Sequence, residues 1–593
     1  MTNPTPDPSP TLKAAEEKVQ HFSRRSDSEL ADLEGEALAG ERHRVILRGR
    51  AERVLASLIM GVGIALRITH YLANRSFWGD EVAVALNLRF RDFSGLLRPL
   101  SYDQTMPLGL LLLFKTTSRV LGFSELALRF LPLLAGCSLV ILIWALFRRV
   151  LEQRVAFLML TLVSLSPSLI YYSAEVKQYG IDALVTVLVV WLGIDLLGNS
   201  TDQNWRKVTV GGAAALLFSQ PIAFVLASIG AAAVVDPRFR SSSTWRKQLA
   251  TASAVWLGVF LVLYLFSYRA TIHSPFMRAF WSPKLLQLTS PSFGSDLSSA
   301  LGFLLGASEV ARIPPLVLGG LFVAGVYAIA RKQGPSMAVL AAGPLALVLL
   351  ASVLKQYPIV IRLVLFAFPL LSWILASGIS AVADLVPGRM SDLVFVALAG
   401  AFVLPTTRDT VWLARHPHQK EGTRDVVRSV NAEGPTPVYL VFGRYIQWGY
   451  YAGDWNHTYL LEQRIDRAAE CLRAAQLGYV QGSDERSSNC KSLAFPGFDG
   501  RAEEIVGNPP PSAARGAIAD ESWAAREAAR IVGGRRSAVW LFLPDAAAHF
   551  IDGFPMRRNL LQKLETDLKA EGCREVEIYA ESETLAHKFE CPH

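Results

Sequence analysis

Two adjacent carboxylates at the end of a membrane-length apolar segment are the residues best placed to do chemistry. Asp80 and Glu81 lie in FWGDEVAVALNLR, residues 77–89, which directly follows the apolar segment 52–72. Ionisable groups are costly near hydrocarbon, so an acidic pair at this boundary indicates a functional site. Such a carboxylate can act as a general base on a hydroxyl or amine, or hold a divalent cation. The alternative is a helix N-cap, because Asp80 precedes a helical run.

A second group of polar residues lies in SPSLIYYSAEVKQYGIDA, residues 166–183. Glu175, Tyr179 and Asp182 have the spacing of one helical face, and Asp182 falls inside the next apolar segment. A carboxylate at that depth needs water or a cationic partner, so a structural ion pair is the alternative to a catalytic role. The cations available as partners are Lys177, Arg67 and Arg362.

Further candidates come from loops and helix ends on the same side of the predicted membrane. Asp103 and Gln104, in YDQTMP, add polar groups after the acidic pair. His273 lies in YRATIHSPFMRAFWSPK. Histidine is a common proton carrier, but no second histidine is nearby, so an ordinary loop role is the alternative. Arg362 opens a late apolar segment, where a lone arginine is either an interfacial anchor or a phosphate ligand.

The composition indicates a membrane protein. The chain has 593 residues, of which 51% are hydrophobic, and its mean hydropathy is +0.30. The apolar residues form blocks of about 17–25, the length of a membrane span. Residues 1–45 differ, because they are Pro-rich and polar, and predict a disordered cytoplasmic tail. The net charge of +8 comes from clusters between the apolar blocks, a positive-inside pattern that argues against nucleic acid as a partner.

The charge pattern also selects a topology for residues 46–405, with about eleven spans. The apolar piece 107–123 is not counted as a span, because the basic cluster FRRVLEQR would then lie outside. We therefore expect interfacial helices over about 82–121, as 82–97 and 107–121, on the outer face. The predicted spans are roughly 52–72, 127–147, 153–171, 177–197, 207–219, 221–236, 248–268, 313–331, 335–354, 362–384 and 390–405.

An odd number of spans and a cytoplasmic N-terminus would put residues 406–593 outside, as a small α/β domain. Strands are predicted over 437–443, 537–544 and 576–580, and amphipathic helices over 423–434 and 556–572. The domain shows no nucleotide-binding or metal-binding motif. Its four cysteines fit disulfides of an exported domain, with adjacent pairing favoured, or they are free thiols; they are Cys471, Cys490, Cys573 and Cys591.

Three ordered stretches resemble the GT-C superfamily of membrane glycosyltransferases. They are RITHYLANRSFWGDEVAVALNL, LLRPLSYDQTMPLGLLLLFKTTSRVLGFSELALRFLPLLAG and SLIYYSAEVKQYGIDAL. The nearest group is the family 39-like one that contains the protein O-mannosyltransferases and the aminoarabinose transferases. The resemblance covers residues 55–200, and 355–385 more weakly. It implies a polytopic α-helical domain that uses polyprenyl-phosphate sugars, in agreement with the missing nucleotide-binding motifs.

The resemblance also implies roles for individual residues. Asp80, with Glu81 beside it, corresponds to the acceptor-activating or metal-binding acid, and Asp182 to a second acidic residue. The residues expected near the donor phosphate are Lys177, Tyr179, Glu175 and Arg362. Two departures stand out. Met106 replaces the lysine of the aminoarabinose transferases, and Lys177 replaces the arginine of the mannosyltransferases. Neither specificity therefore carries over.

The sequence thus predicts a transferase in a bacterial inner membrane. It would move a sugar from a polyprenyl-phosphate donor to a glycan, lipid or protein acceptor at the periplasmic face. A divalent metal at Asp80 is the one cofactor considered. The alternatives are a transporter or lipid flippase, and a non-catalytic envelope scaffold. Against a transporter, the two halves show no internal repeat and the unusual charges gather at one face.

Overall fold

The computed structural model describes the chain in segments that fall into two compact units, Met1–Gly61 and Val62–His593. In the first unit, residues 50–61 are described, and they are helical. The predicted tail 1–45, Asp103, Cys471 and Cys490 lie outside the described residues. The described residues are 50–102, 104–273, 277–278, 281–287, 294–295, 314–417, 422–434, 438–440, 445–453, 525, 528–529, 532, 538–544, 557–581 and 584–591.

The chain is a polytopic α-helical membrane protein. Eight helices of the described part are long and apolar enough to span a membrane: Arg50–Leu72, α4 (Glu125–Phe147), α7 (Tyr179–Gly198), α11 (Ser243–Leu263), α16 (Pro315–Gln333), α17 (Pro335–Val353), α18 and α19 (Ile361–Ala383) and α20 (Arg389–Arg415). Three shorter helices occupy the other predicted spans: α5 (Gln153–Leu165), α8 (Asp202–Leu216) and α9 (Ile222–Val235). Every predicted span therefore contains a helix, and the number that crosses the membrane stays a prediction.

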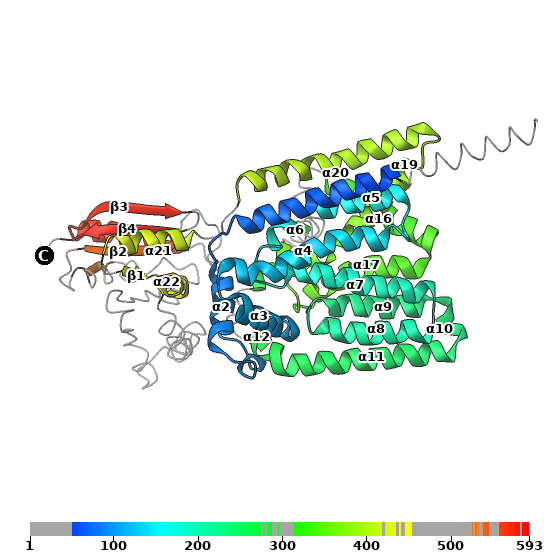
Figure 1. The fold of residues 1–593 in the computed structure, drawn as a ribbon, viewed down its shortest axis with the longest axis horizontal. Helices are drawn as coiled ribbons and strands as arrows, with labels where there is room; N and C mark the ends of the chain where they lie inside the picture. Colours follow the sequence, from blue (N-terminus) through cyan, green and yellow to red (C-terminus); the bar gives the residue numbers. More distant parts are fainter. Residues whose placement is uncertain are drawn as a thin grey trace, which may run out of the picture. The chain divides into compact units, whose positions relative to one another are not determined.

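The most buried spans are α7 and α19. Helix α7 packs against α4, α8 and α9, and α8 packs in turn against α11, so these helices run side by side (Figure 1). Helix α19 packs against α5 and α16. Glycine permits the last contact: a Cβ added to Gly378 would lie 2.0 Å from the Leu321 carbonyl oxygen, and one added to Gly325 would lie 2.0 Å from that of Ile374. Small residues of this kind allow membrane helices to approach closely.

Helices lie where the two interfacial helices are predicted: α2 (Gly79–Phe90), which ends earlier than the predicted 82–97, and α3 (Leu108–Leu121). Their place at the membrane interface stays a prediction. Helix α3 ends at Gly122, whose φ of +87° suits glycine. Helix α2 is covered by other elements, since its residues from Glu81 to Leu88 are all buried. It shares an apolar core with α3 and with two helices from the C-terminal part of the chain, α21 (Thr423–Ala432) and α22 (Tyr445–Ala452).

The C-terminal part is a small α/β domain with a sheet in the order β1-β2-β4-β3. The strands are β1 (Val438–Leu440), β2 (Ala538–Pro544), β3 (Arg574–Glu581) and β4 (Thr584–Glu590). Only β1 and β2 are parallel. Helix α21 packs on β3 and β4 (Figure 1), and α26 (Arg557–Ala570) packs on β3. A disulfide joins Cys573 to Cys591, one of the two adjacent pairs expected from the sequence.

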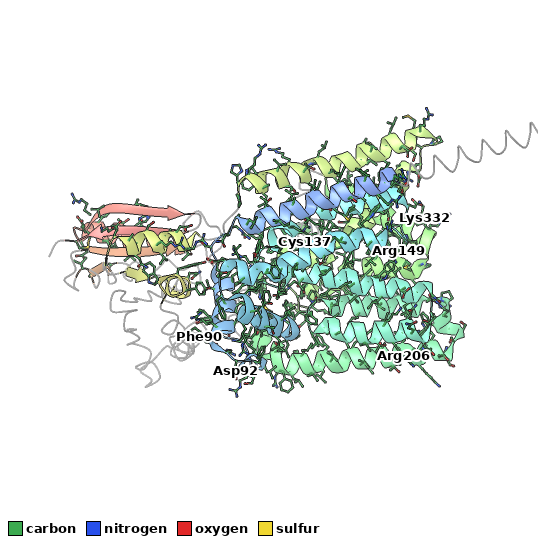
Figure 2. All side chains as sticks on the ribbon, viewed as in Figure 1. Phe90, Asp92, Cys137, Arg149, Arg206 and Lys332 are labelled. Atoms are coloured by element: carbon green, nitrogen blue, oxygen red, sulfur yellow. A yellow bond between two sulfur atoms is a disulfide. The ribbon has the colours of Figure 1, made fainter. Side chains whose placement is uncertain are left out.

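Charged residues mark one end of the helical bundle. Figure 2 shows Arg149, Arg206 and Lys332 at that end, and Phe90 and Asp92 at the opposite end. The first end carries a network in which Lys332 pairs with Glu152 at 2.7 Å and with Asp384 at 3.4 Å, while Arg154 also pairs with Asp384. The basic clusters of the sequence therefore gather away from the acidic pair that opens α2.

Candidate functional site

The first turn of α2 brings a carboxylate, an amide and an ammonium together. Gln104 Nε2 donates to Asp80 Oδ1 at 3.4 Å, and Lys177 Nζ lies 3.9 Å from Asp80 Oδ2. Lys177 also donates to Gln104 Oε1. The Lys177 side chain is 5% exposed and that of Asp80 is 30% exposed. The carboxylate is thus the accessible member of the group, held beside a cation that is almost withdrawn from solvent.

Glu81 faces the opposite way, into the protein. Arg129 Nε donates to Glu81 Oε1 at 2.9 Å and Arg129 Nη2 to Oε2 at 2.6 Å, and the Val176 N–H donates to Oε1 at 2.8 Å. Burial opposes ionisation of Glu81, but Arg129 outweighs it and holds the pKa of Glu81 below its ordinary value. With its oxygens occupied, Glu81 is suited to positioning neighbouring residues.

The Glu81–Arg129 pair fixes both segments that carry the site. Arg129 donates to the carbonyls of Arg75 and Ser76, which precede Asp80. Through Val176, Glu81 holds the turn that carries Lys177. Arg75 supports the same turn by donating to the Ala174 carbonyl at 2.9 Å. These contacts explain how residues almost a hundred positions apart in the sequence meet at Asp80.

A second cation lies near the carboxylate. The Arg362 guanidinium, at the start of α18 (Ile361–Val364), lies 5.5 Å from the centroid of the Trp78 ring and 5.4 Å from that of Trp281. It interacts electrostatically with Tyr179 and Asp80, and less strongly with Glu175. The structure therefore gathers Asp80, Lys177, Gln104, Tyr179, Glu175 and Arg362 in one region.

Asp182 occupies a different environment, one turn further into α7, where it is 4% exposed. The ion pair considered from the sequence is not present within the described part of the chain. Arg67 instead donates to the carbonyls of Gly63, Val163 and Ser164, because a guanidinium in apolar surroundings can be satisfied by backbone oxygens as well as by a carboxylate.

His273 lies apart from these residues. It is exposed and its Nδ1 is 2.8 Å from the Arg269 carbonyl oxygen in its own short helix, α12 (Arg269–His273). The same helix contacts the loop before α3, since Thr105 donates to Thr271 at 2.7 Å. No described contact joins His273 to Asp80, so the geometry favours an ordinary loop role for it.

The cation beside Asp80 favours an anion there over a divalent metal. Among the described residues, no group of three or more His, Cys, Asp and Glu side chains could hold a metal ion. Lys177 lies 3.9 Å from Asp80, and a cation at that distance would repel a metal on the same carboxylate. The arrangement fits a carboxylate base beside an anion-binding group.

The C-terminal part contributes residues that the sequence analysis did not single out. The Phe77 N–H donates to the Tyr451 hydroxyl at 2.6 Å, and that hydroxyl donates to Glu125 Oε1 at 3.2 Å. Arg424 Nη1 donates to Glu125 Oε1 at 3.1 Å. The backbone N–H of Arg424 donates to Ser76 Oγ at 3.3 Å. We call Tyr451, Glu125 and Arg424 the clasp. Like Arg129, it holds the segment before Asp80, through Ser76 and Phe77.

The electrostatics of the clasp keep the Tyr451 hydroxyl protonated. Burial, and next the charge of Glu125, raise the pKa of Tyr451 well above its ordinary value. The hydroxyl therefore keeps its proton and can donate to Glu125 while accepting from Phe77. Gln447 of α22 lies close by as well, because a Cβ on Gly79 would meet its Nε2 at 3.0 Å.

Comparisons with known proteins found one family match and several distant structural similarities. Residues 105–269 match the model of a family described as dolichyl-phosphate-mannose-protein mannosyltransferase. ArnT from Cupriavidus metallidurans in the apo state aligns with 13% identity and a TM-score of 0.47, over 91% of this chain and 98% of that chain. AglB from Archaeoglobus fulgidus, an archaeal oligosaccharyltransferase in complex with an inhibitory peptide and a dolichol-phosphate, aligns with 14% identity and a TM-score of 0.46, over 90% and 74%. No curated protein matches the sequence.

The structural similarities are too distant to fix a substrate for this chain. The family match is more specific, because it covers both α3, beside the acidic pair, and the turn that carries Lys177. It also agrees with the class that the three ordered stretches of sequence resemble. Residues 105–269 are thus similar to a family of membrane glycosyltransferases described as dolichyl-phosphate-mannose-protein mannosyltransferase.

Proposed function

We propose that this protein transfers a sugar from a polyprenyl-phosphate-linked donor to an acceptor at the membrane surface, with Asp80 as the general base. The observation that carries the proposal is the partly exposed Asp80 carboxylate, 3.9 Å from the buried Lys177 ammonium and within electrostatic reach of Arg362. Cations suit the phosphate of such a donor. The matched family's description names a dolichyl-phosphate donor.

The reaction can be written with these groups in defined roles. Asp80 accepts the proton of an acceptor hydroxyl or amine, and the freed electron pair attacks the anomeric carbon of the donor sugar. The bond between that carbon and the phosphate oxygen breaks, and the polyprenyl phosphate leaves with the electron pair. Lys177 and Arg362 stabilise the charge that develops on this phosphate, which is the role of preorganised cations in group transfer.

We propose further that the site faces the periplasm and that residues 406–593 form an exported domain. Three observations support this orientation. The basic network around Lys332 lies at the end of the bundle away from Asp92 (Figure 2), as the positive-inside rule expects of a cytoplasmic end. The C-terminal part carries the Cys573–Cys591 disulfide, and disulfides persist in oxidising compartments. The same part supplies Tyr451 and Arg424 of the clasp on the segment before Asp80.

The experiment compares the wild type with Asp80→Asn in cells and in proteoliposomes. Mass spectrometry of envelope glycans, lipids and proteins identifies the sugar and the acceptor in cells, and transfer from a radiolabelled lipid-linked donor is then measured in proteoliposomes. We expect Asp80→Asn to lower transfer at least a hundredfold, the scale of general base catalysis. Asp92→Asn is the matched control, because Asp92 is an exposed carboxylate just beyond the other end of α2 and accepts hydrogen bonds from its neighbours Ser94 and Gly95. Unchanged transfer in Asp80→Asn would refute the proposal.

A further inference from the structure

The chain departs from regular α-helix at three places around Asp182. Residues 217–221 separate α8 from α9, and α11 ends in a π-helix, Tyr264–Tyr268. A loop that contains Tyr357 separates α17 from α18. Inside a membrane protein, irregular backbone is tolerated where it is buried in protein or lines a polar space. Single π-turns often mark functional sites.

Side chains from all three places approach the Asp182 carboxylate. Ser219 faces it from the break between α8 and α9, and Tyr268 and Tyr357 interact with it electrostatically. Thr186 follows Asp182 by one helical turn in α7 and so lies on the same face. Asp182, Thr186, Ser219 and Tyr268 are each at most 7% exposed. We call these four residues the Asp182 cluster.

The Asp182 cluster has unused hydrogen-bonding capacity. Within the described residues, four of its buried atoms make no hydrogen bond of good geometry, although Ser219 lies within reach of Asp182 and Tyr268 within reach of Gln220. These atoms are Asp182 Oδ1, Thr186 Oγ1, Ser219 Oγ and Tyr268 OH. Buried polar groups without partners are costly, and nearly all of those in native proteins are satisfied by protein, water or ligand. Four such atoms converging from three elements indicate a polar ligand.

The chemistry of the cluster differs from that of the Asp80 region. It combines hydroxyls with a carboxylate, and no described lysine or arginine pairs with Asp182. Hydroxyls donate and accept, and a carboxylate accepts, so the set matches the hydroxyl or amino groups of a sugar and disfavours a phosphate or an acidic sugar. The two regions are contiguous through Tyr179, which interacts with Arg362 and with Tyr357 and precedes Asp182 by three residues, about 4.5 Å along α7.

We propose that the Asp182 cluster is the subsite for the sugar of the donor and selects a neutral or amino sugar. The proposal rests on the proposed function, in which Lys177 and Arg362 hold the donor phosphate. Asp182 then binds substrate instead of taking the acceptor proton. Because Asp182 lies deeper in α7 than Lys177 and Tyr179, the sugar would lie deeper in the helical bundle than the donor phosphate.

The test measures binding of two kinds of lipid to the full-length protein in detergent. One is bare undecaprenyl phosphate, and the other is undecaprenyl phosphate that carries a neutral hexose, a 4-amino pentose or a uronic acid. We expect Ser219→Ala and Thr186→Val each to weaken binding of the preferred glycosylated lipid about five- to tenfold, the scale of one lost hydrogen bond. Binding of undecaprenyl phosphate should not change. We expect the uronic acid lipid to bind least well.

A measurement without ligand separates this role from a structural one. Removing a buried hydroxyl that has no partner should leave the thermal stability of the protein unchanged or raise it, whereas a structural hydroxyl would lower it. Ser228→Ala is the matched control, because this buried serine of α9 already donates to the Phe224 carbonyl at 2.8 Å, and it should leave lipid binding unchanged.

The outcomes distinguish the two proposals. If the wild type binds neither probe, the proposed function fails. If it binds glycosylated and bare lipid with equal affinity, or if Ser219→Ala weakens both equally, the sugar subsite is overturned while the proposed function stands. Preferred binding of the uronic acid lipid would overturn the assigned sugar class.

Discussion

The clasp predicts that a hydroxyl in the C-terminal part controls the segment before Asp80. Tyr451→Phe removes the acceptor of the Phe77 N–H, at 2.6 Å, and the donor to Glu125, at 3.2 Å. A buried donor left without a partner costs about 1–3 kcal/mol. Because about 1.4 kcal/mol corresponds to a tenfold change, a cost near 2 kcal/mol makes local opening of this segment about thirty times more frequent.

Amide hydrogen exchange, followed on peptides that cover residues 73–81, measures this opening directly. We expect faster exchange at the Phe77 amide in Tyr451→Phe, with unchanged exchange in α16 and α19. In the transfer assay the same variant should lower kcat with little change in KM for the donor, because Asp80 loses its placement while Lys177 keeps its contact with Gln104. In an Asp80→Asn background, Tyr451→Phe should cause no further loss.

Tyr450→Phe is the control for this experiment. Tyr450 is the neighbouring residue of α22, and its hydroxyl donates to the Phe123 carbonyl at 3.0 Å. Its ring packs edge-on against Phe77, with 5.7 Å between the ring centroids, and a phenylalanine keeps that ring. It should therefore leave the Phe77 amide unchanged. If both variants speed exchange equally, or if Tyr451→Phe leaves the amide protected, the reasoning about the clasp is wrong.

Two further predictions concern stability. Glu81→Gln leaves the Arg129 charge buried without its partner and should destabilise the protein by about 3–5 kcal/mol in thermal unfolding, whereas Asp92→Asn should have almost no effect. Because the pKa of Glu81 is lowered in the folded protein, ionised Glu81 stabilises the fold fully above its unfolded pKa, about 4.3. This contribution to the free energy of unfolding is lost as the pH falls through the lower folded pKa. If acid lowers the stability of the wild type and of Glu81→Gln equally, this prediction is wrong. Cys573→Ser opens the disulfide across a separation of 18 residues, so the C-terminal part should lose about 3 kcal/mol; equal protease resistance with and without a reducing agent would count against it.

The positions of the membrane-length helices, and of the shorter helices α2 and α3, were predicted well, because apolar blocks carry a local signal of helix length. The environments of individual side chains were predicted less well, because they depend on the direction in which each side chain points. Asp80 and Glu81 were considered together for chemistry, yet neighbouring helical residues point about 100° apart. One carboxylate therefore meets solvent and Lys177, and the other meets Arg129.

Other features depended on distant partners. An ion pair was considered for Asp182, but Arg67 found backbone carbonyls instead, a choice that no local pattern reveals. Strand β4 was not predicted, because TLAHKFE contains lysine, histidine and glutamate, although Ala586 and Phe589 are fully buried in the sheet. Helix α22 was missed because YIQWGYYA is short and aromatic. Its helical form and its role both depend on packing against α2 and α21.

The clasp also has a consequence for how the protein is made. Phe77 and Tyr451 are 374 residues apart in the sequence, and synthesis at about 5–20 residues per second separates their appearance by roughly 20–75 seconds. Once Arg129 has been made, the nascent chain carries Asp80, Glu81 and Arg129 but still lacks the C-terminal residues that also hold the loop before them. In the proposed mechanism, Asp80 would therefore be fully positioned only late in biogenesis, after the C-terminal part has been synthesised.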